Sequence, residues 1–168
     1  MRKYMMALII FPLLGFAQDN CKCCTPQHKA FDFWLGEWEV FLPDGNKAGE
    51  NSIIKIQDNC ILQEHWKSAN PKFTGTSFNF YNSKTAKWEQ LWIDNQGQHL
   101  KLYGNRRDNQ MILKSEKFKD KDGNAVYNRI TWTKNDRGTV RQLWETITLV
   151  NEKELVKVIF DGLYKPKQ

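Results

Sequence analysis

Short runs of alternating apolar and polar residues, separated by turn-forming residues, recur along most of this chain. Pro43-Asp44-Gly45-Asn46, Asn95-Gln96-Gly97 and Asp120-Lys121-Asp122-Gly123 are three of the separators. Asn-Gly and Asp-Gly pairs between β-rich runs are typical of β-hairpins. The runs that we expect to be strands are residues 38–41, 51–57, 60–67, 74–81, 87–94, 99–103, 111–118, 128–133, 139–149 and 154–164.

About nine or ten short strands at this even spacing predict an all-β protein with a single antiparallel meander. The natural end state of such a meander is a closed up-and-down β-barrel, because closure removes the exposed edges of the sheet. One short helical turn is expected ahead of the strands, at residues 27–35, where Thr25-Pro26 would begin it. The chain has no internal repeat and no low-complexity segment.

The first residues have the pattern of an export signal. Arg2 and Lys3 precede an apolar run from Met5 to Leu14, and Gly15-Phe16-Ala17 resembles a cleavage site. The run is too short for a membrane span, which needs roughly 20 residues. A lipoprotein is the weaker alternative, because Cys21 does not directly follow the small residue.

We therefore predict an exported protein, periplasmic or extracellular. Residues 1–17 would be the signal peptide, residues 18–30 a cysteine-rich leader and residues 31–168 one barrel domain. Without Arg2 and Lys3 the formal charge falls from +6 to +4, and the remaining lysines are scattered among acids. Nucleic-acid binding requires a concentrated basic face, so the expected partner is a small molecule, and the sequence leaves the oligomeric state open.

Four cysteines, Cys21, Cys23, Cys24 and Cys60, are all that the chain contains. An oxidising compartment permits disulfides, and Cys60 stands at the head of a predicted strand. We expect a structural disulfide from Cys60 to the leader, through Cys24 or Cys23, with Cys24–Cys60 as the prediction. A cluster of the leader cysteines with His28 around a soft metal is the alternative; no metal and no cofactor are predicted.

The stretch from Trp88 to Asp94 carries the clearest indication of a binding surface. Alternate side chains of a strand share a face, so Trp88, Gln90, Trp92 and Asp94 line one side. Two indoles, an amide and a carboxylate are an unusual filling for a dry core. They suit a cavity that stacks on a flat molecule and hydrogen-bonds its edge.

The segment Phe31-Asp32-Phe33-Trp34-Leu35-Gly36-Glu37-Trp38-Glu39-Val40 resembles the opening motif of a set of secreted bacterial proteins of unassigned function with a lipocalin-like, calycin-type barrel. Later segments match the same pattern, at residues 59–66, 75–81, 88–94, 129–132, 140–145 and 160–164. Gly36-Glu37-Trp38 also resembles the Gly-x-Trp signature that opens many lipocalins. One segment departs from the pattern, since residues 149–154 replace the Asp-Gly-Gly-x-Thr-Trp turn that members often carry.

The resemblance implies a lipocalin-like fold with a ligand-sized cavity, and it implies no reaction. In those barrels the tryptophan of the signature plugs the closed end. We therefore interpret Trp34, Gly36 and Trp38 as structural, with Gly36 allowing close approach of the backbone or an unusual φ.

Glu64 and Trp66 share a face of the strand that begins at Cys60, and this face resembles that of Trp88 to Asp94. If both faces line the barrel interior, their acids need partners, because a lone buried charge costs several kcal/mol. Arg129 and Arg141 are the candidates. The expected ligand-binding residues are Glu64, Trp66, Trp88, Gln90, Trp92, Asp94, Arg129 and Trp144.

On the run 139–149 we expect Gln142, Trp144 and Thr146 to face inward, with Arg141 and Glu145 outward; a β-bulge would invert this.

The leading hypothesis is an exported barrel that binds a partly aromatic or amphipathic small molecule. One alternative is a hydrolase that uses Glu64 and Asp94, although no catalytic residue is assigned. Another is a solid barrel, with a structural salt-bridge network inside, that binds partners through its loops. Haem held by one of the three histidines is a further alternative.

Overall fold

The structure is a computed structural model that describes residues 21–70, 72–151 and 153–167. The predicted signal peptide, residues 1–17, lies outside the described residues. One 3-10 turn, η1, precedes the strands. The elements are η1 (Asp32–Trp34), β1 (Gly36–Phe41), β2 (Lys47–Ile56), β3 (Ile61–Ser68), β4 (Thr74–Asn82), β5 (Lys87–Asp94), β6 (His99–Arg107), β7 (Gln110–Lys114), β8 (Phe118–Lys119), β9 (Ala125–Lys134), β10 (Val140–Val150) and β11 (Lys153–Pro166).

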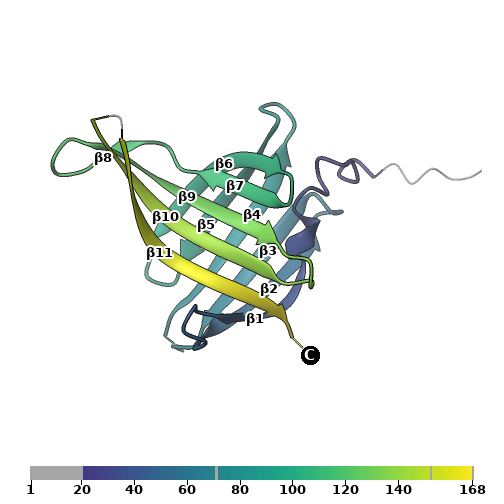
Figure 1. The fold of residues 1–168 in the computed structure, drawn as a ribbon. Helices are drawn as coiled ribbons and strands as arrows, with labels where there is room; N and C mark the ends of the chain where they lie inside the picture. Colours follow the sequence, from purple (N-terminus) through teal and green to yellow (C-terminus); the bar gives the residue numbers. More distant parts are fainter. Residues whose placement is uncertain (1–20, 71, 152, 168) are drawn as a thin grey trace, which may run out of the picture.

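The strands form one antiparallel sheet that closes on itself (Figure 1). Each strand from β1 to β6 pairs with the next in the chain, β7 pairs with β9, and β11 lies between β10 and β1. Pairing of β9 with β10 completes the ring. Without the two-residue β8 the barrel has ten strands, which confirms the predicted all-β up-and-down fold.

The predicted run 111–118 divides into β7 and β8, because Ser115 interrupts the pairing of this run with β9. The Ser115 hydroxyl donates to Glu116 O (2.8 Å) and accepts from Asn128 N–H (2.9 Å). A side chain thus takes over a hydrogen bond that the sheet would otherwise make between backbones.

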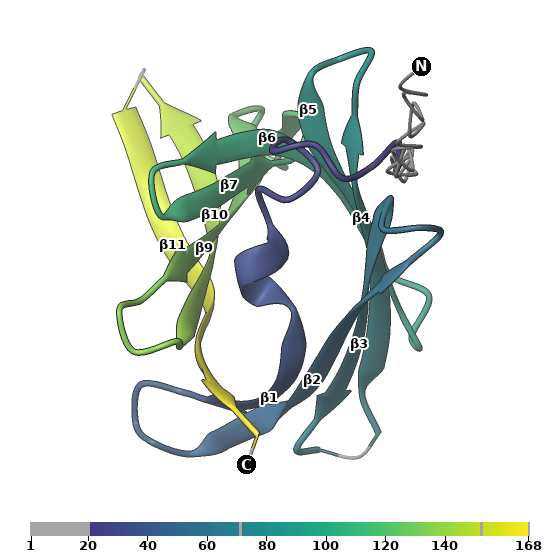
Figure 2. The ribbon, with the colours of Figure 1, turned by 90° about the vertical axis from the view of Figure 1, so that its right-hand side faces the viewer.

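The segment before β1 enters one end of the barrel and fills it (Figure 2). Phe31 and Trp34 are fully buried there, stacked on one another with ring centroids 5.0 Å apart. Both rings also contact Trp132, and Phe31 packs edge-on against Trp88. Complete burial of such a side chain stabilises a fold by roughly 2–3 kcal/mol, so this plug is a main part of the core.

The turn from η1 into β1 depends on Gly36, whose φ of +131° is one that L-amino acids with a Cβ rarely adopt. Trp38, two residues on, points back into the barrel and donates its indole N–H to Trp34 O (2.9 Å). The Gly-x-Trp segment therefore links the plug to the first strand of the wall.

Two disulfides hold the leader, and their pairing differs from the prediction. Cys60 pairs with Cys23, not with Cys24, which pairs with Cys21. The reason is a tight turn, closed by Cys24 N–H donating to Cys21 O, that brings Cys21 and Cys24 to within 5.4 Å (Cα–Cα). Cys23, buried at the tip of this turn, is left facing Cys60.

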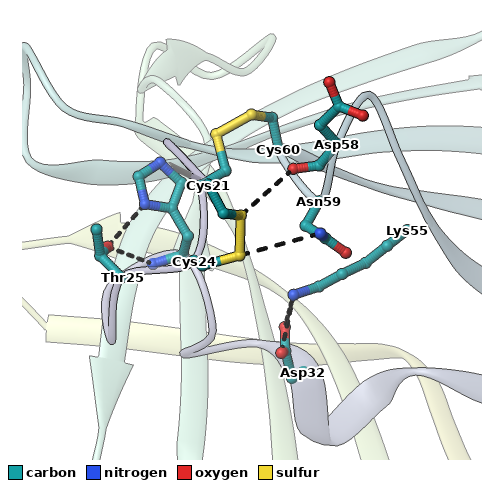
Figure 3. Close-up of a disulfide and its surroundings, with 10 residues drawn as sticks. Cys21, Cys24, Thr25, Asp32, Lys55, Asp58, Asn59 and Cys60 are labelled. Atoms are coloured by element: carbon teal, nitrogen blue, oxygen red, sulfur yellow. Dashed lines mark hydrogen bonds and ion pairs between the residues drawn. A yellow bond between two sulfur atoms is a disulfide. The ribbon is translucent and has the colours of Figure 1, made fainter. Parts of the chain in front are cut away.

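Figure 3 shows the Cys21–Cys24 disulfide lying against Asp58 and Asn59, at the turn between β2 and β3. Close by, Lys55 pairs with Asp32 of η1 at 2.8 Å. Because every cysteine sulfur is in a disulfide, the alternative of a cysteine-ligated metal is wrong. Such disulfides form and persist in oxidising compartments.

In residues 21–70, 72–151 and 153–167 no helix is long and apolar enough to span a membrane.

Replacing Cys23 and Cys60 together with Ala should lower the free energy of unfolding by about 4 kcal/mol, because their disulfide closes a loop with a sequence separation of 37. The paired change Cys21→Ala and Cys24→Ala is the control; its separation is only 3, and the expected loss is about 2 kcal/mol. Urea unfolding followed by tryptophan fluorescence measures both. Equal losses would contradict the anchoring role of Cys23–Cys60.

Candidate functional site

A chain of polar side chains, buried except for the half-buried Gln142, crosses the inside of the barrel at mid-height. We call it the polar belt; its members are Asn51, Glu64, Ser77, Asn79, Gln90, Gln142 and Tyr164. On the side of the belt nearer η1 lies the aromatic plug. On the other side stand Trp66, Trp92, Trp144 and Phe160, which we call the mouth residues. The three tryptophans are one inward position from a belt residue, and Phe160 is two inward positions from Tyr164.

The polar belt is continuous through hydrogen bonds between neighbouring strands. Asn51 Nδ2 donates to Glu64 Oε1 (2.7 Å) and to the Tyr164 hydroxyl (3.2 Å). Tyr164 in turn donates to Gln142 Oε1. On the other side of Glu64, the Ser77 hydroxyl donates to Oε2 (2.5 Å).

The belt continues from Ser77 to β5. Asn79 Nδ2 donates to Ser77 Oγ (2.8 Å), and Gln90 Nε2 donates to Asn79 Oδ1 (2.7 Å). Asn51 Oδ1 is buried and has no hydrogen-bond partner among the described residues. A buried acceptor without a partner is costly, so the belt has room for one more donor.

Glu64 is the buried carboxyl of the belt, 4% exposed. Burial raises its pKa from 4.5 to about 7, against the opposing effect of the hydrogen bonds from Ser77 and Asn51. Burial and the nearby Glu64 also raise the pKa of Tyr164 well above its ordinary value. Near neutral pH a substantial fraction of Glu64 is protonated, and a protonated Oε2 can donate to Ser77 Oγ.

The mouth residues face inward yet remain partly exposed to solvent. Their orientation follows from strand alternation, since each stands two residues from an inward belt residue or from Gly162. Solvent therefore reaches these inward side chains at the end of the barrel opposite the leader (Figure 1).

Three mouth rings lie against glycines of the barrel wall. A Cβ at Gly75 would come within 2.1 Å of the Trp92 ring, and one at Gly49 within 2.8 Å of Trp66. The Phe160 ring covers Gly162 in the same way, at 2.5 Å. The glycines therefore allow these rings to lie flat along the wall.

The remaining mouth ring is fixed by a hydrogen bond. Trp144 donates its indole N–H to Asn128 Oδ1 (2.9 Å), which also accepts from Thr146 Oγ1 (3.2 Å). Gln142, Trp144 and Thr146 thus lie on the inner face, and Arg141 and Glu145 on the outer face, as the sequence predicts.

The predicted ligand-binding residues are therefore divided among different places. Glu64 and Gln90 belong to the belt, and Trp66, Trp92 and Trp144 to the mouth. Trp88, 2% exposed, is part of the plug and donates to Gln27 O at 3.1 Å. Asp94 ends β5, where its carboxylate accepts the N–H groups of Gln96 and Gln98 (both 2.9 Å) and shapes the turn.

The sequence led us to expect that Arg129 and Arg141 neutralise the interior acids, and this prediction is wrong. Arg129 lies on the outer face and pairs with Glu145 at 2.9 Å, while Arg141 pairs with Asp161 at 2.7 Å. The physical reason is strand alternation: Ile130 and Trp132 occupy inward positions of β9, so Arg129, the residue before Ile130, points outward.

Five belt or mouth residues were not predicted from the sequence: Asn51, Ser77, Asn79, Phe160 and Tyr164. Ser77 and Asn79 could have been predicted by the same alternation that identified Trp88 to Asp94, because both lie on one face of the predicted strand 74–81. Asn51 and Phe160 become part of the site only through closure, which brings β11 and β2 to either side of β1.

No protein-family profile matches this chain, and neither does any curated protein sequence. The site is therefore interpreted from its own geometry.

The free energy of unfolding should fall as pH rises from about 4.5 to about 7. In this window the folded protein holds a proton on Glu64 that the unfolded chain has released, so the stabilisation is complete below 4.5 and lost above 7. The expected loss is up to about 3 kcal/mol. Glu64→Gln should remove this part of the slope, whereas Glu116→Gln, at an exposed position, should keep it; urea unfolding at each pH is the measurement.

Proposed function

We propose that this protein is an exported, lipocalin-like barrel that binds a small amphipathic molecule at its open end. The observation that carries the proposal is the set of inward-facing aromatic side chains that stay partly exposed beside a buried polar belt. Small-molecule sites in proteins combine these two kinds of surface, an apolar lining and a few convergent polar groups.

The mouth residues would hold the body of the ligand. Trp92 and Trp66 present flat faces against the wall, and Phe160 packs edge-on to Trp66 with ring centroids 6.0 Å apart. Stacking on such rings contributes about 0.5–1.5 kcal/mol beyond the burial of apolar area. A planar or aromatic body suits this arrangement.

The polar belt would orient the head of the ligand. Asn51 Oδ1 is an acceptor without a partner, and the Glu64 carboxyl beside it also accepts hydrogen bonds. Both favour a donating head, either a hydroxyl or an amine. In this proposal Glu64, Gln90, Trp66, Trp92 and Trp144 contact the ligand, Trp88 supports them from the plug, and Arg129 has no contact.

The resemblance at residues 31–40 agrees with this proposal. In lipocalin-like barrels the Gly-x-Trp segment lies at the closed end of the barrel, so a ligand would enter from the other end. Export is proposed on two grounds, the signal-like sequence of residues 1–17 and the two disulfides of the leader.

The arrangement does not favour a hydrolase built on Glu64 and Asp94. Glu64 stands on β3 opposite Ser77, and Asp94 on β5 opposite Gly75, so two strand spacings separate them. At about 4.8 Å per spacing their backbones lie about 10 Å or more apart, and the Asp94 carboxylate serves the turn. Paired catalytic carboxylates both face the scissile bond, whereas the Asp94 carboxylate accepts the N–H groups of Gln96 and Gln98.

A direct test is the binding of N-phenyl-1-naphthylamine, a fluorescent aromatic amine with a donating N–H. The purified protein should bind it saturably, and Trp92→Ala should weaken binding about tenfold through loss of the stacking surface. The matched control is Ile93→Ala, since Ile93 follows on the same strand, faces outward and is 47% exposed. It should bind like the unaltered protein.

Gly75→Ala provides a second variant, which retains the Trp92 side chain but displaces its ring. The added Cβ would force the Trp92 ring off the wall, so probe affinity should also fall while near-ultraviolet circular dichroism still reports a folded protein. No saturable binding, or the same loss in Ile93→Ala as in Trp92→Ala, would contradict the proposed site.

A further inference from the structure

The outer face of the barrel carries a second, separate hollow. It is a groove of about 750 Å³ across β6, β7, β9 and β10. The residues that line it point outward, so it shares no side chain with the polar belt or the mouth. We propose that this groove binds an extended anionic sugar chain, an oligosaccharide that carries carboxylate groups.

Strand register builds the floor of the groove. Asn105, Ile112, Thr131 and Leu143 stand directly opposite one another on the four strands and form one row across the sheet. None of them is charged, and each is shorter than the same-face residues on either side, except that Thr131 is matched by Thr133. With strands about 4.8 Å apart, the row is about 14 Å long, enough for an extended chain lying across the strands.

Cations stand on both sides of this floor. Lys114 and Arg129 are opposite one another in the row on one side, and Arg107 and Arg141 belong to the row on the other side. The two rows are four residues apart along each strand, about 13 Å at the backbone. A ligand along the floor would therefore meet positive charge on both flanks.

The charges of the groove do not cancel. Glu145 is the acid in the lining, against four cations. It pairs with Arg129 at 2.9 Å, and Glu154, outside the lining, stands 3.7 Å from the same guanidinium. Asp161, also outside the lining, holds Arg141 with two hydrogen bonds of 2.7 and 2.8 Å. These pairs fix the two guanidinium groups in position, and among the described residues Arg107 and Lys114 have no carboxylate partner.

The neutral part of the lining favours a sugar over other polyanions. Asn105, Thr131, Gln110 and Thr133 offer amide and hydroxyl groups, which hydrogen-bond to sugar hydroxyls. Single-stranded nucleic acids, by contrast, are bound through several aromatic side chains on which bases stack. Tyr103 is the one aromatic residue of this lining.

The test uses oligogalacturonate of four to six units as probe, with isothermal titration calorimetry on the full exported chain. Binding should be saturable, weaken as sodium chloride is added, and be absent for a neutral malto-oligosaccharide of equal length. Lys114→Glu and Arg107→Glu should each weaken it about tenfold or more, as expected when a charged contact becomes repulsive.

Lys87→Glu is the matched control, because it changes the net charge equally at an exposed position of β5 that does not line the groove. It should leave the affinity within twofold of the unaltered protein, and Trp92→Ala should do the same. Equal losses in Lys87→Glu would show attraction by net charge alone and overturn the proposal. Absence of binding, or equally tight binding of oligothymidylate, would overturn it too.

Discussion

The whole interior depends on the plug that Phe31 and Trp34 form at one end of the barrel. Eight strands make a barrel that wall side chains can just fill, so a ten-strand barrel leaves space that other groups must occupy. The segment between the leader and β1 supplies two fully buried aromatic rings, Phe31 and Trp34, and the Cys23–Cys60 disulfide ties the leader just before it to the start of β3. Filling from one end only is what distinguishes the two ends of this molecule.

Polarity inside the barrel follows from this asymmetry. Beside the plug, inward positions are mostly apolar; at mid-height they form the polar belt, whose groups hydrogen-bond between strands and leave Asn51 Oδ1 without a partner among the described residues. Beyond the belt the aromatic rings are reached by solvent and lie flat over glycines. A ligand entering from the open end would meet apolar faces first and hydrogen-bonding groups second, which is the order that an amphipathic molecule requires.

The outer face shows that the same wall can carry a second kind of surface. Because successive side chains of a strand point to opposite sides, the strands that close the core inside can present cations outside without conflict. Arg129 illustrates this: its neighbours Ile130 and Trp132 bury themselves in the core, while its own guanidinium lines the outer groove.

The sequence alone determined the all-β fold class, nearly all the strand positions and the inward orientation of four side chains, Trp66, Gln90, Trp92 and Trp144. It could do so because residue alternation and turn-forming residues are local signals. It could not assign Cys60 to Cys23, since only the geometry of the leader turn separates Cys23 from Cys24. Nor could it place Arg129 outside or join Asn51 to Tyr164. Those depend on register and closure, which bring residues 113 positions apart within hydrogen-bonding distance, and only the tertiary structure decides them.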